Sequence, residues 1–131
     1  MFRGFVVVIG LLGAAGCADD RPADWDYVYS AILRPNCATA ACHSAIVKQS
    51  GLDMSTPDRA YQTLVRRPCG STSTPAPTPH GANVDPGHPE TSAIMYWLRG
   101  RDNQTMPPDV PLPDAEIEAV ERWIREGATC D

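Results

Sequence analysis

The chain has 131 residues, among them 11 Lys and Arg against 16 Asp and Glu, and its formal net charge is −5 at pH 7. An acidic chain is poorly suited to nucleic acid or anionic lipid, so the charge favours a neutral or basic protein partner. The sequence shows no nucleophile beside a base and no glycine-rich phosphate loop, and hydrolase or transferase chemistry is therefore unsupported.

Residues 1–16 have the pattern of a bacterial signal peptide. Arg3 precedes an apolar run from Phe5 to Ala15, which at about a dozen residues is shorter than the ~20 that a spanning helix needs. The next stretch, AAGC, resembles the lipobox of bacterial lipoproteins, in which the cysteine after the cleaved bond is acylated. This resemblance implies a lipid on Cys17, and Ala18 after it implies the outer membrane. An ordinary secretory signal with a chance cysteine is the alternative.

Removal of the signal peptide leaves a short tether (17–24) and one domain (25–131). Helical periodicity and end signals predict four helices in the domain, and no stretch alternates like a strand. We therefore expect an all-α domain with a long Pro-rich loop over 71–89. Its core should be thin, and a large apolar cofactor placed where the helices converge would fill it. The expected helices span residues 25–34, 57–66, 90–99 and 114–126.

The ends of these helices have recognisable signals. Asp24 and Thr56 are expected to cap the first two helices, and Pro35 is expected to end the first. Gly100 and Gly127 are expected to end the last two. The first helix therefore delivers the chain directly to a cysteine-rich segment.

Four cysteines remain in the domain, and they allow three pairings. Cys37 and Cys42 lie beside a histidine, whereas Cys69 and Cys130 have no such neighbour. The economical division is a local pair with its own chemistry and a long-range disulfide from Cys69 to Cys130. Closing that loop of about sixty residues would stabilise the fold by about 4 kcal/mol on the chain-entropy model.

The local pair belongs to the segment CATAACH, residues 37–43. A c-type haem attachment site normally reads C-x-x-C-H, whereas here four residues separate the cysteines. Ala38 to Ala41 are small enough to bulge outward and keep both sulfurs at one haem edge. A Cys37–Cys42 disulfide is also feasible and would contribute about 2 kcal/mol. A zinc site is a poorer interpretation, because only three ligands cluster and no fourth is evident.

The order of segments along the whole domain resembles a known family. A helix leads to C-x4-C-H, and SGLDMSTPDRAYQTLV, VDPGHPETSAIMYWLRG and MPPDVPLPDAEIEAVERWIREGA follow. Over residues 27–128 this order is similar to the small c-type cytochrome domains of bacterial surface and periplasmic proteins, especially planctomycete-type cytochrome c and related lipoproteins. The resemblance implies a cytochrome c-like fold with one covalently attached haem c. It assigns the thioethers to Cys37 and Cys42, the proximal iron ligand to His43 and the distal ligand to Met106.

The resemblance implies an electron carrier rather than an enzyme. We expect a membrane-anchored monohaem c-type cytochrome that passes single electrons between periplasmic or surface proteins, in contact with the membrane through its lipid. The alternative is a haemless cytochrome-like lipoprotein in which a Cys37–Cys42 disulfide stabilises a binding or structural module. His80 and His88 lie in loops and are second choices for the sixth iron position.

Overall fold

The computed structural model describes residues 21–73 and 81–131. Within these residues the chain is helical and contains no strand, which confirms the all-α prediction. No helix in the described ranges is both long and apolar enough to cross a bilayer. The elements in chain order are α1 (Trp25–Tyr27), the π-helical segment η1 (Val28–Leu33), α2 (Arg34–Asn36), the 3₁₀ turn η2 (Gln49–Gly51), α3 (Pro57–Val65), α4 (Ala93–Leu98), the 3₁₀ turn η3 (Arg101–Asn103) and α5 (Asp114–Arg125).

α1, η1 and α2 form one continuous helix that starts at the predicted cap. The side chain of Asp24 accepts a hydrogen bond of 2.8 Å from the amide of Tyr27. This bond satisfies one of the amides that a helix start leaves without a partner.

The prediction that Pro35 ends this helix was wrong, because the helix continues to Asn36. A proline normally breaks a helix because it lacks an amide and its ring meets the carbonyl four residues earlier. Here the preceding turn is widened, and the amide of Arg34 donates to the carbonyl of Tyr29, five residues back. The Asn36 side chain donates to the carbonyl of Ile32 at 2.7 Å.

The remaining helices follow their end signals closely, except at one start. The hydroxyl of Thr56 accepts from the amide of Arg59 at 3.3 Å, as expected for the cap of α3. α5 ends before Gly127, whose φ of +104° suits glycine. α4 begins three residues later than predicted, at Ala93, because the hydroxyl of Ser92 binds the carbonyl of His88 at 2.9 Å and holds the preceding residues in turns.

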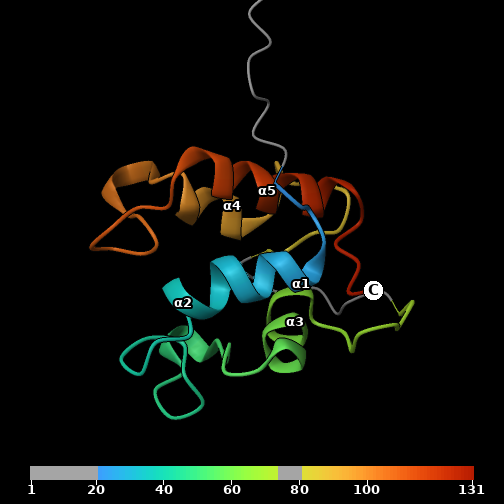
Figure 1. Ribbon diagram of the computed structural model, residues 1–131, viewed down its shortest axis with the longest axis horizontal. Helices are drawn as coiled ribbons and strands as arrows, with labels where there is room; N and C mark the ends of the chain where they lie inside the picture. The colour runs from blue at the N-terminus through green and yellow to red at the C-terminus, as the bar shows by residue number, and fades with distance from the viewer. Residues whose placement is uncertain (1–20, 74–80) are drawn as a thin grey trace, which may run out of the picture.

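The helices form layers around the first helix. Figure 1 shows α4 and α5 on one side of α1–α2 and α3 on the other side. The loop that follows α2 and the loop between α4 and α5 both lie at the end of the molecule where α2 ends. This arrangement brings the cysteine-rich segment near the segment that contains Met106.

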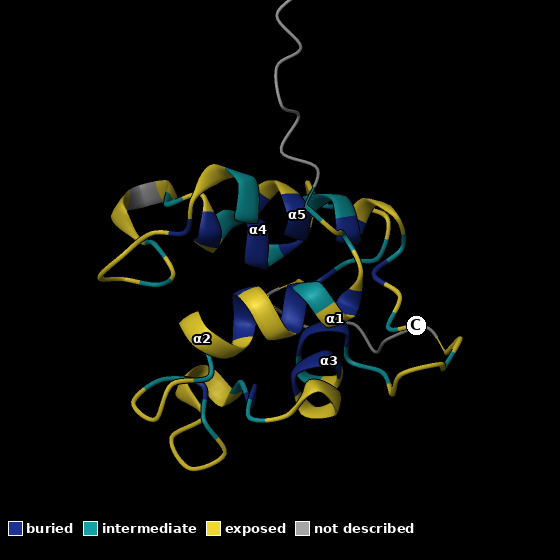
Figure 2. Cartoon of the chain, viewed as in Figure 1, coloured by how far each residue is buried: buried dark blue, intermediate teal, exposed yellow. Residues whose placement is uncertain are grey.

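Three aromatic residues from three helices fill the centre of the molecule. The rings of Trp25 and Trp123 stack with centroids 5.1 Å apart, and Tyr61 meets Trp25 edge-on at 5.3 Å. All three side chains are buried, and the buried residues lie on the inner faces of the helices in Figure 2. The helices therefore converge on aromatic side chains at this point, and the expected cofactor between the helices stays a prediction.

The predicted disulfide between Cys69 and Cys130 is present, with the two Cα atoms 5.7 Å apart. It joins the end of α3 to the C-terminal segment. A second link runs in parallel, since the hydroxyl of Tyr61 donates to the carbonyl of Ala128 at 2.9 Å. Closing a loop of this length removes conformational entropy from the unfolded chain, so the disulfide stabilises this small fold.

Candidate functional site

The CATAACH segment folds back on itself directly after α2. The amide of Cys37 donates to the carbonyl of Leu33 at 2.7 Å, which keeps this cysteine attached to the helix end. The amide of His43 then donates to the carbonyl of Cys37 at 3.1 Å and closes the loop. The spacer residues Thr39, Ala40 and Ala41 are exposed. The long spacer therefore bulges into solvent, as expected from its small side chains, while the backbone of His43 stays beside Cys37.

His43 is held in a defined orientation. Its ring is buried, with 9 % of the residue exposed, and Nδ1 lies 3.1 Å from the carbonyl oxygen of Gln49. A carbonyl oxygen can only accept, so Nδ1 carries the hydrogen and Nε2 of the neutral ring keeps a free lone pair. Metal-binding histidines are typically fixed in this way by a backbone carbonyl on the second ring nitrogen.

An apolar pocket brings three of the four predicted haem residues together. Cys37 contributes from the end of α2, His43 from the loop, and Met106 from the loop between α4 and α5. The amide of Met106 donates to the carbonyl of Trp97 at 3.0 Å, which fixes this loop against α4. Cys42 is adjacent to His43 but is not among the lining residues. The other lining residues are Leu33, Leu52, Met54, Leu64, Asn83, Ile94, Trp97 and Leu98.

The chemistry of this pocket fits a haem, whereas its open volume fits only part of one. Imidazole and thioether are the axial ligands of many c-type cytochromes, and an apolar lining suits the macrocycle. The open volume is about 70 Å³, which is smaller than the apolar cavity of roughly 150 Å³ known to bind benzene. Trp97 and Met106 are 36 % and 39 % exposed, so these two side chains form the rim that would have to move outward.

Cys37 and Cys42 are both free thiols in the structure. Burial, with a smaller effect of the neighbouring Cys42, raises the pKa of Cys37 to about 11. The Cys37 thiol is therefore protonated at neutral pH. Within residues 21–73 and 81–131, no group of three His, Cys, Asp or Glu side chains is placed to hold a metal ion.

A strap of residues 48–54 supports His43 from the backbone side. The amide of Gln49 donates to the carbonyl of Cys42 at 3.0 Å, and the amide of Met54 donates to the carbonyl of His43 at 2.8 Å. Lys48 and Ser50 have φ values of 45° and 55°, an uncommon conformation for residues with side chains. The strap therefore curls around the histidine and presents the Gln49 carbonyl to its ring.

The buried side chain of Asp53 secures the strap at both ends. Its Oδ1 accepts bonds from the amide and hydroxyl of Ser55 at 3.1 and 2.6 Å, and its Oδ2 lies 3.4 Å from Lys48 Nζ and 3.6 Å from Arg59 Nη1. The Ser55 hydrogen bonds, together with Lys48, hold the pKa of Asp53 below its usual value. Asp53 was not predicted as a site residue, although the D-x-S pattern is typical of a side chain that caps its own turn.

The two alternative histidines are not part of the pocket. His88 is exposed, and its Nδ1 lies 3.2 Å from a carboxylate oxygen of Glu90. His80, like the predicted lipidation site Cys17, lies outside the described residues. Of the predicted tether, Arg21 is described. Its carbonyl accepts from Arg122 of α5, and its guanidinium donates to Glu116 of α5.

The chain matches no protein-family model, no curated protein and no solved structure.

Proposed function

We propose that this chain is a monohaem c-type cytochrome with a cytochrome c-like fold, and that it carries single electrons between proteins of the bacterial cell envelope. One observation supports this proposal above all: Met106, which is far along the chain from the CATAACH segment, lines the same apolar pocket as Cys37 and His43. The carbonyl of Gln49, 3.1 Å from Nδ1 of His43, leaves Nε2 as the ligand atom.

In this proposal each residue has one role. Cys37 and Cys42 hold one haem c by thioether bonds, His43 Nε2 is the proximal ligand, and the Met106 thioether is the distal ligand. The haem supplies one-electron chemistry, and the protein adjusts its reduction potential through the ligands, burial and hydrogen bonding. The chain carries out no bond-making reaction of its own and is not an enzyme. Its acidic surface favours a neutral or basic redox partner.

The test is to express the whole chain together with a c-type haem attachment machinery. We expect the intact mass to rise by one haem that remains after denaturation, and a low-spin haem absorption spectrum. Replacement of both Cys37 and Cys42 by alanine should abolish covalent haem, whereas Ser44→Ala beside His43 should retain it. The opposite result is a protein without haem in which the mass of the segment with Cys37 and Cys42 is lower by two hydrogens, the mark of a disulfide. This result would refute the cytochrome and support the haemless module.

The membrane anchor is a separate part of the proposal and needs its own test. If Cys17 is acylated, two or three acyl chains hold the protein on the outer membrane, since one chain alone binds only marginally. Cys17→Ala should therefore release the protein into the soluble fraction. The wild-type chain, which has both Cys17 and the signal peptide, should stay in the membrane fraction. Unchanged membrane association of Cys17→Ala would contradict lipid anchoring and leave the haem proposal intact.

A further inference from the structure

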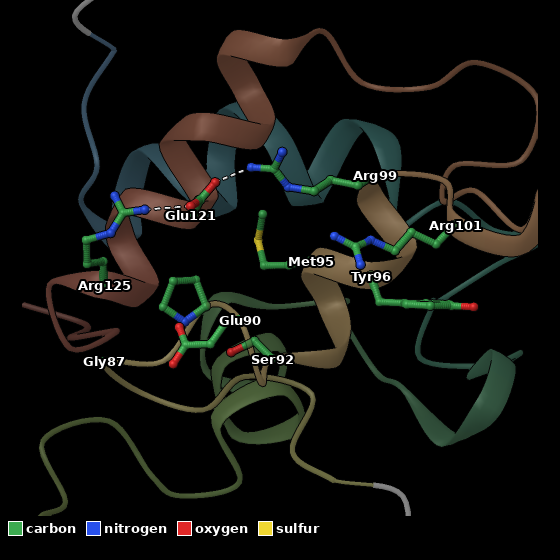
Figure 3. A pocket seen from close by; sticks show the side chains of 10 residues that line it. Gly87, Glu90, Ser92, Met95, Tyr96, Arg99, Arg101, Glu121 and Arg125 are labelled. Atoms are coloured by element: carbon green, nitrogen blue, oxygen red, sulfur yellow. Dashed lines mark hydrogen bonds and ion pairs between the residues drawn. The ribbon is translucent and has the colours of Figure 1, made fainter.

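α4 separates the apolar pocket from a second, polar cleft. Ile94, Trp97 and Leu98 line the apolar pocket, whereas Met95 and Arg99 line the cleft on the other side of the helix. This cleft lies between α4, α5 and the 87–92 turn, and it has an open volume of about 620 Å³. Figure 3 shows the side chain of Met95 in its centre with charged groups around it.

Three guanidinium groups converge on this cleft in an otherwise acidic protein. Arg99, Arg101 and Arg125 line it together with two carboxylates, Glu90 and Glu121. The lining thus has a net charge of +1, from three positive and two negative groups, whereas the whole chain has a net charge of −5. A local excess of positive charge raises the local concentration of anions. We call this site the arginine cleft.

Glu121 fixes two of the three guanidinium groups. One of its carboxylate oxygens binds Arg99, directly after α4, and the other binds Arg125 on α5, as the dashed lines in Figure 3 show. Each contact uses one nitrogen of its guanidinium, and a guanidinium has five N–H donors. The shared carboxylate therefore holds both side chains in place across the cleft while donors remain for a ligand.

Arg101 is the third guanidinium, and it forms no ion pair with any residue in the described ranges. Figure 3 shows its side chain turned towards Tyr96 and the space beside Met95. Glu90 is engaged by His88, 3.2 Å from the histidine ring. Arg101 is therefore the guanidinium of the cleft that no lining carboxylate engages.

We propose that the arginine cleft binds a small oxyanion with two or more negative charges, that is, a phosphate ester or a polycarboxylate. Planar guanidinium groups bind phosphate and carboxylate oxygens in pairs, which selects these anions over halides. The volume of about 620 Å³ is in the range of small-molecule sites, roughly 300 to 1,000 Å³. The buried Met95 provides an apolar surface for the remainder of the ligand.

This inference is independent of the haem proposal, because no residue of the arginine cleft lines the apolar pocket. The test uses the whole exported chain and measures binding by calorimetry at constant ionic strength. The probes are inorganic phosphate, citrate and chloride, together with phosphatidylglycerol vesicles to separate a free anion from a lipid headgroup. We expect saturable binding of phosphate or citrate, and none of chloride.

The decisive variant is Arg101→Gln, since this side chain is exposed and its loss should leave the fold intact. It should weaken oxyanion binding by about tenfold, the effect of one charge-assisted hydrogen bond. Arg34→Gln, at an exposed position on α2, is the matched control and should bind as the wild type does. If Arg101→Gln misfolds, Arg125→Gln is measured in its place and should also weaken oxyanion binding. Equal affinity in all variants, or binding only to vesicles, would overturn the proposal.

Discussion

Nδ1 of His43 and the backbone carbonyl oxygen of Gln49 lie 3.1 Å apart, and the two residues are six positions apart in the sequence. The carbonyl cannot donate, so this contact selects the tautomer of the neutral ring with hydrogen on Nδ1. The strap that contains Gln49 is bonded to the backbone of both Cys42 and His43. The histidine is therefore prepared to offer Nε2 before any ligand is present.

The tautomer of His43 can be measured without haem. Nitrogen chemical shifts of the ring in the haem-free protein should show Nδ1 protonated and Nε2 unprotonated in the neutral form. His88, which is exposed and contacts a carboxylate, serves as the internal comparison. A neutral His43 with hydrogen on Nε2 would contradict the arrangement and weaken the assignment of the proximal ligand.

Asp53 should make the fold sensitive to acid. Its pKa is lowered in the folded state by hydrogen bonds from Ser55 and by Lys48, whereas the unfolded value is about 3.9. Its contribution to stability is therefore complete above the unfolded pKa and is lost as pH falls through the lower folded pKa. Asp53→Asn should unfold at lower urea concentration at pH 7, and the difference from wild type should shrink below about pH 4.

The control for this prediction is Asp109→Asn, at an exposed loop position, which should change neither the midpoint nor its dependence on pH. Hydrogen exchange tests the same role locally in the strap. Asp53→Asn should increase the exchange rates of the Gln49 and Met54 amides more than those of the α5 amides. A difference between wild type and Asp53→Asn that stays constant from pH 2 to about 7 would contradict the role of the ionised carboxylate.

The disulfide between Cys69 and Cys130 should be a major source of stability. It closes a loop of 61 residues, and the chain-entropy model gives about 4 kcal/mol for a loop of this length. Replacing both cysteines by alanine should lower the free energy of unfolding by about this amount, measured by urea titration. The exposed neighbours Thr72 and Thr129 provide a control double alanine variant that should be close to wild type.

Much of the fold could be predicted because helix ends have local signals. Thr56 caps α3 through its own hydroxyl, and Gly127 permits the conformation that ends α5. The errors have non-local causes. Pro35 stays inside a helix because the preceding turn widens, and α4 starts late because Ser92 binds the turn before it. Neither adjustment can be read from residue type alone.

The sequence predicted the side chains that line the pocket, but it did not predict the backbone contacts that hold them. Cys37, His43 and Met106 have recognisable types and flanks, and the structure places them in one pocket. The partner of His43 is a backbone carbonyl, which every residue possesses. Its position depends on the left-handed conformations of Lys48 and Ser50, and sequence gives no signal for these.

Met106 should be the distal iron ligand in the haem-loaded protein. Met106 lines the pocket with His43 and is held by the amide contact to Trp97, and we propose that its thioether binds iron once this rim side chain has moved to admit the haem. Met106→Ala should abolish the weak sulfur-to-iron absorption band at the red end of the oxidised spectrum. It should also lower the reduction potential, since thioether ligation raises it, and open the iron to cyanide or imidazole.

Two leucine variants separate ligation from packing. Met106→Leu keeps the volume of the side chain and removes the sulfur, so it should lose the band and lower the potential as Met106→Ala does. Met54→Leu changes the other methionine that lines the pocket, which is buried, and should retain both properties. If Met106→Leu keeps the wild-type spectrum and potential, Met106 only packs against the pocket. Replacement of His80 and His88 by alanine would then identify the sixth ligand, beginning with His80, because His88 is exposed and engaged by Glu90.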